Sequence, residues 1–447
     1  MKSTWEATIW ENGRVRKETF IAESKPEYGQ EKNVINLYPE DKQQTWEGFG
    51  GSLTEAPAYL FSTMPEHVQR ELLDAYYSPG GLEYTLGRIS LDSCDAALGN
   101  YSAITEPIPP DALTLPGFSL ERDEWYILPL LRRIWAIRPL DLMLSPWSPP
   151  WFMKTNGERN HGGSLRPEYR KLWAAYFVRY IQEYEKRGIH ISSLSVQNEP
   201  AAVQTWDSCI VSAEEEKSFI REELAPALKQ AELDVDIYIW DHNKERAYER
   251  TRTVMDTDDM YDLVSGVAFH WYSGDHFESL QYLAEWYPEL KLRFSEGCVE
   301  YSVYGEGAAE LDNARMFGHE ICGDMNAGTS SFITWSIVFD QDGGPNHVNN
   351  LCDAPILYDT ATKTLHRTLS YEYIGHFSRY IVPGSEHIRL SKFSDDLDAT
   401  AFLRPDGSIA VVIMNRTSEM KRVFIRLEDE VIMIRVAGDA IVSGIIE

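Results

Sequence analysis

One short run, Ile191-Ser192-Ser193-Leu194-Ser195-Val196-Gln197-Asn198-Glu199-Pro200, is strand-like until it ends in a carboxylate that proline follows at once. A second run has the same design, because Leu290-Lys291-Leu292-Arg293-Phe294-Ser295-Glu296-Gly297-Cys298 ends in an acid that glycine follows. Pro and Gly interrupt strands, so each carboxylate is expected to stop at the rim of a sheet. Most Glu side chains are merely solvated, so these two gain meaning only from their surroundings.

The chain around these runs alternates between strand-like and helix-like segments. Strands are expected near residues 46–53, 85–93, 140–145, 191–197, 235–241, 264–271, 291–296 and 331–336. Helical patterns lie between them, at Pro65–Tyr77, Glu121–Ala136, Pro167–Lys186, Ala213–Ala231, Phe277–Trp286 and Asp312–Asn326. This alternation predicts an α/β fold, a parallel (β/α)8 TIM barrel. A doubly wound sheet is the alternative, but Gly48-Phe49-Gly50-Gly51 lacks the spacing of a dinucleotide-binding loop.

Both ends of the chain have strand patterns instead. Residues 4–10 and 34–38 are β-rich, and from about residue 385 apolar and polar residues alternate around the turn Pro405-Asp406-Gly407. We therefore expect one appended β-sandwich domain built from both chain termini. The predicted domains are residues 1–44 (first strands of the side domain), 45–368 (catalytic barrel) and 369–447 (a last helix-like segment and the rest of the side domain).

Composition narrows the choice of partners. The 447 residues are 43% hydrophobic, which allows a large core, and their formal charge is -28. That charge disfavours nucleic acid and anionic lipid surfaces and favours a neutral ligand. Five cysteines without a CxxC pair indicate reduced thiols, with no zinc site or disulfide framework. We expect no metal and no cofactor.

The N-terminus, residues 1–8, has no long apolar region and no cleavage-site pattern. Apolar runs also stay well short of the roughly 20 residues that cross a bilayer. We therefore expect a cytoplasmic protein without a transmembrane segment, with secretion by a leaderless or trimmed route left open. The sequence leaves the oligomeric state undetermined.

Polar and aromatic residues collect at the predicted strand ends, where a barrel of this kind holds its chemistry. Following the order of the strands, they are Arg88 and Asp95, Trp147, Asn198 and Glu199, Asp241 and His242, His270 and Tyr272, Glu296, and Trp335. His270 fits a buried, hydrogen-bonded histidine better than a catalyst. For Asp241 and His242, ligand contact and simple bonding across the rim are evenly balanced.

Two carboxylates at one rim are typical of glycosidic bond cleavage. A retaining glycosidase needs an acid for the leaving oxygen and a carboxylate nucleophile roughly 5 Å away, which the fourth and seventh strands of a barrel can supply. Glu199 is the better acid/base because Asn198 beside it can bind the sugar 2-hydroxyl. Glu296 is then the nucleophile, supported by Arg88 or Tyr272. The residues alone leave the reverse assignment open.

Several motifs together resemble glycoside hydrolase family 30, in particular its glucosylceramidase-like branch. They are Gly48–Ala56, Ser93-Cys94-Asp95, Ser145-Pro146-Trp147, Asn198-Glu199-Pro200, His270-Trp271-Tyr272, Ser295-Glu296-Gly297 and Gly343-Gly344-Pro345-Asn346. The resemblance implies a retaining β-glycosidase with Glu199 as acid/base and Glu296 as nucleophile. It also implies a first sugar subsite lined by Asp95, Trp147, Asn198, Tyr272, Trp335 and Asn350.

Two departures from this branch lie on the side of the leaving group (the aglycone). His347 stands where the lysosomal relatives carry Trp, and Trp206 takes roughly the place of a family aromatic. We therefore expect hydrolysis of a small-molecule or glycolipid β-glucoside, with the aglycone left open. The alternatives are a β-1,6-glucanase or β-xylosidase of the same family and, in another class, a non-catalytic carbohydrate-binding protein.

Overall fold

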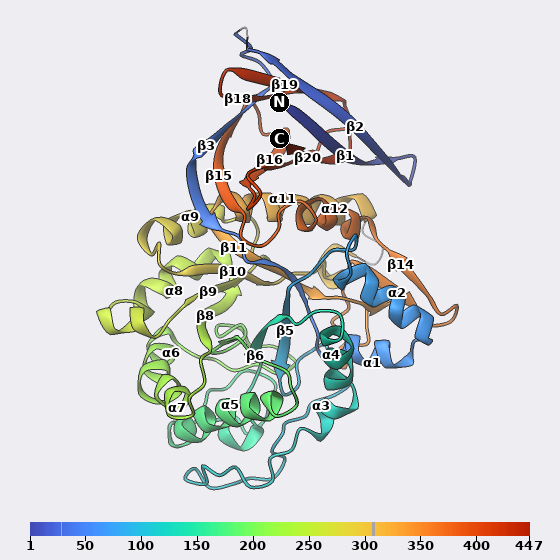
Figure 1. The fold of residues 1–447 in the computed structure, drawn as a ribbon. Coiled ribbons are helices and arrows are strands. Elements are labelled where there is room, and N and C mark those ends of the chain that lie inside the picture. Colours follow the sequence, from blue (N-terminus) through green and yellow to red (C-terminus); the bar gives the residue numbers. More distant parts are fainter. Residues whose placement is uncertain (28, 306–308) are drawn as a thin grey trace.

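The computed structural model describes residues 1–27, 29–305 and 309–447, which form two domains stacked one on the other (Figure 1). The larger domain is a closed parallel barrel with the strand order β10-β11-β4-β5-β6-β7-β8-β9. Its strands are β4 (Gly48–Ser52), β5 (Leu86–Leu91), β6 (Asp141–Pro146), β7 (Ser193–Ser195), β8 (Asp236–Asn243), β9 (Gly266–His270), β10 (Lys291–Glu296) and β11 (Thr329–Ser336). The predicted TIM barrel is confirmed, with each strand within the predicted run or a few residues of it.

Helices surround this barrel, as Figure 1 shows for most of them. They are α1 (Glu55–Thr63), α2 (Glu66–Tyr77), α3 (Glu121–Trp125), α4 (Ile127–Trp135), α5 (Arg170–Glu185), α6 (Ala213–Phe219), α7 (Ala225–Gln230), α8 (Ala247–Val254), α9 (Phe277–Trp286), α10 (Tyr301–Tyr304), α11 (Glu310–Asn326) and α12 (Leu369–Ser378). A small sheet of β12 (Phe339–Asp340), β13 (Ile356–Asp359) and β14 (Thr364–Arg367) lies beyond β11.

Two predicted helices are each divided. The stretch Glu121–Ala136 breaks at Tyr126, whose backbone leaves the helical region between α3 and α4. The stretch Ala213–Ala231 holds a wide π-turn at Ile220–Leu224 between α6 and α7. Pro226 sits just after that turn and lacks the N–H that would continue the ordinary ladder, so the helix widens there. The sequence patterns did not predict α1, α8 and the short α10.

The side domain contains nine strands in the closed order β1-β2-β19-β18-β3-β15-β16-β17-β20. They are β1 (Lys2–Glu11), β2 (Arg14–Pro26), β3 (Val34–Thr45), β15 (Glu386–Lys392), β16 (Leu397–Leu403), β17 (Ile409–Asn415), β18 (Lys421–Leu427), β19 (Glu430–Val436) and β20 (Ala440–Ile446). The predicted β-sandwich from both termini is confirmed, and the described strands close into a hydrogen-bonded ring without a free edge.

Strand β2 was missed because it is largely exposed and polar. A local signal was present nonetheless. Asn12 and Gly13 both have positive φ (54° and 73°) and join β1 to β2, as expected for an Asn-Gly hairpin turn.

Helices α11 and α12 lie between the barrel and the side domain (Figure 1). In α12 the buried His376 ring contacts Ser443 Oγ of β20 at 2.7 Å and Thr8 Oγ1 of β1 at 2.8 Å. One histidine thus joins the first strand, the last strand and the barrel side. The two domains therefore contact each other through α11 and α12.

The glycines of β4 have a packing role. A Cβ on Gly50 would lie 2.4 Å from the carbonyl oxygen of Leu86 in the neighbouring strand. Only glycine allows the two strands to approach this closely. Strand packing thus accounts for Gly50, and no role in binding a dinucleotide is needed to explain it.

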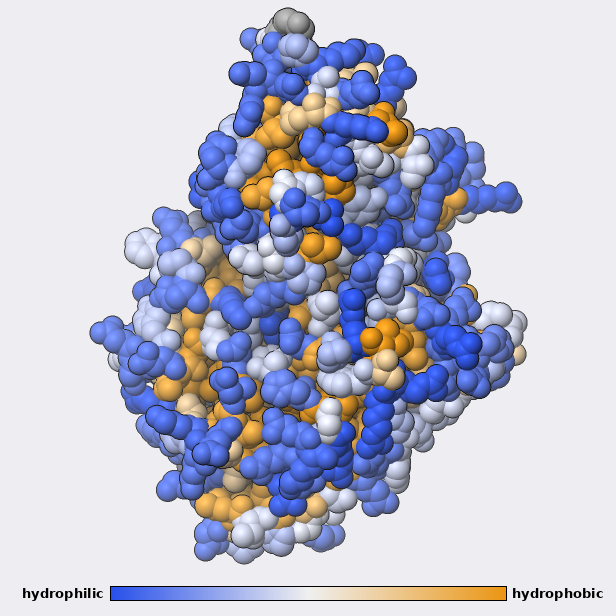
Figure 2. Space-filling model, viewed as in Figure 1, coloured by the Kyte–Doolittle hydropathy of each residue, from blue (hydrophilic) through white to orange (hydrophobic). Residues whose placement is uncertain are grey.

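Hydrophilic side chains cover much of the face shown in Figure 2, with apolar side chains visible between them. Among the described residues, none of the helices combines the length and apolar character required to traverse a bilayer.

Candidate active site

The carboxyl ends of the barrel strands meet around one cavity of about 130 Å³. Its lining includes most of the predicted site residues, together with five that were not in the predicted site. The lining residues are Asp95, Trp147, Asn198, Glu199, Gln204, Trp206, His242, Asn243, Tyr272, Glu296, Cys298, Glu300, Trp335 and Asn350. Arg88 and His270 lie beneath this lining and contact the two glutamates from below.

The backbone at the strand ends is unusual. Glu199 has φ of 47°, and Trp240 and Asp241 in β8 have φ of 74° and 52°. The register between β8 and β9 shifts between Trp240 and His242, and the Glu199 N–H donates to the Asp241 carbonyl at 2.9 Å. Such left-handed conformations are costly for residues with side chains and collect at functional sites. The hydrogen bond from Glu199 to Asp241 connects the loop that follows β7 to the end of β8.

Glu296 receives two strong donors. Arg88 Nη1 lies 2.6 Å from Glu296 Oε2, and the Tyr272 hydroxyl donates to Glu296 Oε1 at 3.0 Å. Both residues proposed from the sequence to orient this carboxylate are therefore in contact with it. With each oxygen bonded to a different donor, the plane of the carboxylate is fixed.

Glu199 has longer and looser contacts. A His270 ring nitrogen lies 3.4 Å from Glu199 Oε1, and the Gln204 side-chain amide lies 3.4 Å from Glu199 Oε2. His242 Nε2 is 3.9 Å from the same carboxylate. This carboxylate keeps room to exchange a proton with a ligand.

Asp241 lies at the centre of the buried polar network. Arg88, His270, Ser195 and Ser295 all contact its carboxylate, at 2.8, 3.2, 2.5 and 2.6 Å. Asp241 itself is fully buried. The sequence left open whether Asp241 contacts a ligand or bonds to other side chains of the rim. In the structure it bonds to Arg88 and His270 and holds both in place.

Asp95 and its neighbours form the opposite wall. Asn346 and Asn350 donate to Asp95 Oδ2 at 3.3 and 3.2 Å. The rings of Trp147 and Trp335 pack with centroids 5.5 Å apart, and the Arg88 guanidinium lies 4.8 Å from the Trp147 ring centre. Carboxylate, amides and aromatic faces together match the hydroxyls and apolar C–H faces of a sugar ring.

Electrostatics separate the two glutamates in the unliganded site. A hydrogen bond from His270 and the nearby charge of His242 outweigh burial and hold the pKa of Glu199 down at about 2. Burial raises the pKa of Glu296, against the opposing charges of His270 and Arg88. Burial disfavours charge on His270, but Glu296, Asp241 and Glu199 raise its pKa to about 9. The raised pKa favours a protonated His270, whose ring lies between Glu199 and Asp241.

The two carboxylates are close to one another. Ligand atoms of Glu199, His270 and Glu296 all lie within 4.8 Å of one another. These residue types also bind metals, but Arg88 already neutralises Glu296, and both His270 nitrogens already contact carboxylates. The cluster is therefore better suited to moving protons than to holding a cation.

Comparison with known proteins places this geometry in a family. Residues 46–381 match the glycosyl hydrolase family 30 TIM-barrel domain, and residues 384–443 match the glycosyl hydrolase family 30 beta sandwich domain. The chain belongs to glycosyl hydrolase family 30. It is therefore a glycoside hydrolase, and the resemblance seen in the sequence motifs is confirmed.

Individual relatives of this family 30 chain differ in what they act on. The lysosomal acid glucosylceramidase of Mus musculus is 32% identical over 404 residues, which cover 86% of this chain and 78% of that protein. SrfJ from Salmonella typhimurium has a TM-score of 0.95 at 36% identity, covering 100% of this chain and 99% of that one. The endo-beta1,6-glucanase BT3312 has a TM-score of 0.86 at 25% identity, with coverage of 100% and 99%.

Some cavity residues of this family 30 enzyme escaped the sequence reasoning. Gln204, Asn243 and Glu300 lie in loops or at a strand end without a periodic signal, and only the folded chain brings them together. Cys298 is buried and also borders the cavity, with its sulfur 3.6 Å from the Tyr272 hydroxyl. His347 lies outside the lining and contacts the backbone oxygens of Asp95 and Ala97.

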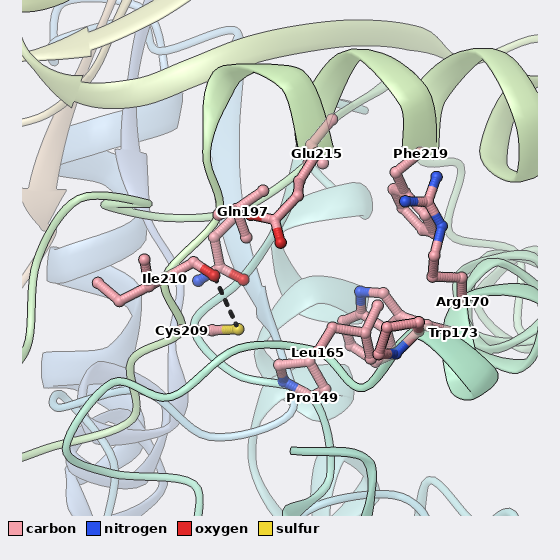
Figure 3. Close-up of a pocket in the computed structure, with 12 residues that line it drawn as sticks. Pro149, Leu165, Arg170, Trp173, Gln197, Cys209, Ile210, Glu215 and Phe219 are labelled. Carbon is pink, nitrogen blue, oxygen red and sulfur yellow. Dashed lines mark hydrogen bonds between the residues drawn. The ribbon is translucent and has the colours of Figure 1, made fainter. Parts of the chain in front are cut away.

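Another, smaller cavity of about 70 Å³ is bordered by Val196 and Gln197, which precede Glu199 in the chain. Figure 3 shows Arg170 and Trp173 from α5 and Glu215 and Phe219 from α6 around it, facing Cys209. Its walls are mostly apolar and include a single carboxylate. Cleavage of a glycosidic bond needs a carboxylate pair, so the chemistry belongs to the first cavity.

Proposed function

We propose that this protein is a retaining β-glucosidase of the glucosylceramidase-like type, with Glu296 as nucleophile and Glu199 as acid/base. The supporting observation is the separation of the two carboxylates, whose closest ligand atoms lie within 4.8 Å. Retaining enzymes hold their carboxyl groups about 5–5.5 Å apart, whereas inverting enzymes leave room for a water at roughly 6.5–9.5 Å.

The roles follow from the contacts. Glu296, oriented by Arg88 and Tyr272, attacks the anomeric carbon while Glu199 protonates the oxygen of the departing aglycone. Water then enters, Glu199 takes its proton, and the glycosyl–Glu296 ester is hydrolysed with overall retention. Asp95 and Asn350 bind sugar hydroxyls, Asn198 the 2-hydroxyl, and Trp147 and Trp335 the apolar ring face.

We further propose that a proton held by His270 is the one that Glu199 passes to the leaving oxygen in the first step. In the unliganded site it resides on His270, 3.4 Å from Glu199 Oε1. A bound sugar displaces water and weakens the stabilisation of an ionised Glu199, so the proton moves along this contact to the carboxylate. His270 thereby acts as a positioning residue that loads the acid.

The experiment that tests both roles uses azide. In Glu296→Ala, azide occupies the space of the nucleophile and attacks once, so an activated β-glucoside yields the α-glucosyl azide. In Glu199→Ala, Glu296 still forms its ester and azide then gives the β-glucosyl azide. Exchanged products would reverse the assignment, and labelling of a peptide other than that of Glu296 by a 2-fluoro-glucoside would refute it.

A second candidate substrate is a β-1,6-linked glucan. The supporting observations are the structural likeness to the endo-beta1,6-glucanase BT3312 and the polar side chains Gln204 and Glu300 in the cavity. Product analysis by NMR on nitrophenyl β-glucoside, glucosylceramide and β-1,6-glucan identifies the sugar, the linkage and the anomeric outcome together. Inversion on any of them would exclude the proposed mechanism.

A further inference from the structure

A third glutamate, Glu300, lines the active-site cavity beside the two catalytic ones. It follows β10 by four residues, immediately before α10. Its backbone forms an isolated β-bridge with Cys352, which fixes its place at the rim. The side chain is half-buried and belongs to neither the catalytic pair nor the wall formed by Asp95.

The Glu300 carboxyl has no protein partner within the described part of the chain, in either ion pairs or side-chain hydrogen bonds. Every other carboxylate of this cavity has a donor: Arg88 for Glu296, His270 for Glu199, Asn350 for Asp95. Burial and the charges of Glu199 and Glu296 raise the pKa of Glu300 to about 7. A half-buried carboxyl without a donor is unfavourable, and a ligand that brings a donor removes that cost.

Glu300 belongs to the part of the cavity lining that the proposed sugar-binding residues leave over, and the aglycone has to occupy that part. The wall of Asp95, Trp147 and Trp335 takes the sugar, and Glu199 delivers its proton toward the departing oxygen. The Glu199 side of the cavity also holds Gln204, 3.4 Å from that carboxylate.

We propose that Glu300 is a specificity-determining residue that accepts a hydrogen bond from a hydroxyl or ammonium group on the aglycone, close to the scissile oxygen. This inference rests on the proposed function and deepens it by naming the chemistry of the leaving group. An aglycone with such a donor gains a charge-assisted bond, and a purely apolar one leaves the carboxyl unsatisfied.

The test compares leaving groups of equal size. Wild type, Glu300→Ala and Glu300→Gln are assayed for glucose release from propyl, 2-hydroxyethyl and 2-aminoethyl β-glucosides, with nitrophenyl β-glucoside as the reporter of basic activity. In Glu300→Ala, kcat/KM for both donor-bearing aglycones should fall by about 10-fold or more relative to the propyl glucoside. Glu285→Ala, an exposed glutamate on α9, is the matched control and should leave these ratios at their wild-type values.

The Glu300→Gln variant distinguishes a hydroxyl donor from an ammonium donor on the aglycone. Glutamine keeps an accepting oxygen without charge, so selectivity for the hydroxyl survives and selectivity for the ammonium is lost. The ammonium preference of the wild type should also strengthen as pH rises through about 7, where Glu300 ionises. Equal ratios in wild type and Glu300→Ala would overturn the inference while nitrophenyl cleavage still supports the proposed function. Absence of wild-type cleavage of every β-glucoside would refute both.

Discussion

Arg88 Nη1 lies 2.6 Å from Glu296 Oε2, and both side chains are buried. The same guanidinium donates to Asp241 at 2.8 Å and to Asn198 at 2.8 Å. Arg88 thus contacts three groups at once: Glu296, which we propose as the nucleophile, the buried Asp241, and the side-chain oxygen of Asn198. Lysine cannot replace it, because a single ammonium lacks the rigid fork that reaches all three.

Replacing Arg88 should therefore damage both stability and activity. Arg88→Gln removes the buried cation that Glu296 and Asp241 share, so we expect a loss of about 3–5 kcal/mol in the free energy of unfolding. Urea unfolding measures this loss. Arg88→Lys keeps the charge and should unfold closer to wild type while kcat/KM still falls by about 100-fold. An Arg88→Lys variant with wild-type kcat/KM would contradict the positioning role.

The Tyr272 hydroxyl gives a cleaner test of how Glu296, the proposed nucleophile, is oriented. Tyr272→Phe removes the 3.0 Å bond to Glu296 Oε1 and leaves the ring in place. We expect kcat to fall by about 10- to 100-fold, with little change in the melting temperature. Tyr77→Phe, which removes a buried hydroxyl far from the cavity, serves as the control and should retain full activity. Equal kinetics of the two variants would show that the bond is without consequence.

Loss of His270 should shift the pH profile. In wild type the shared proton is lost only as pH rises through about 9, the pKa of His270. In His270→Gln the acid form depends on Glu199 alone, so the basic limb of kcat/KM should move to lower pH. The pH profiles of wild type and His270→Gln on propyl β-glucoside, whose leaving oxygen has to be protonated, measure this shift. An unchanged basic limb would refute the loading of Glu199 by His270.

A buried ion triad away from the cavity makes a stability prediction. Lys244 Nζ lies 2.9 Å from Asp324 Oδ1 and also contacts Glu320, both on α11. Lys244→Met strands two buried carboxyls and should cost about 3–5 kcal/mol. Adding Glu320→Gln and Asp324→Asn should recover most of that loss in urea unfolding, because the uncompensated charges are removed together. If the triple variant is as unstable as Lys244→Met, the loss in the free energy of unfolding comes from packing and not from the uncompensated charges.

The contact between the domains should respond to pH. His319 on α11 lies 3.1 Å from Asp398 of the side domain and 3.1 Å from Asp275 of the barrel. Hydrogen bonding to Asp398, against burial, raises the pKa of His319 to about 9. Its contribution is therefore present below the ordinary histidine pKa of about 6.5 and lost as pH rises through about 9. Melting temperatures from pH 6 to 9.5 should fall more steeply for wild type than for His319→Gln, and parallel curves would contradict this.

Much of this protein follows from the sequence alone. Period-two and helical patterns, which report which face of each segment is buried, predict every barrel strand and the side domain made by both termini. The runs ending in Glu199 and Glu296 identify a carboxylate pair at one rim, because parallel strands bring their carboxyl ends to the same edge. The motifs that indicate the family and the proposed sugar-binding residues are short contiguous stretches, so they can also be recognised without the structure.

Only the tertiary structure decides how these groups act on one another. The left-handed backbone at Glu199 and Asp241, the central place of Asp241 and the proton on His270 depend on distances between strands that no local pattern encodes. Glu300 shows the same limit, since it is an ordinary loop glutamate until folding places it in the cavity that Glu199 also lines, where the described part of the chain offers its carboxyl no donor. Residue types and periodicity determine which elements form, whereas burial and Coulomb interactions, which exist only in the folded chain, determine charge and role.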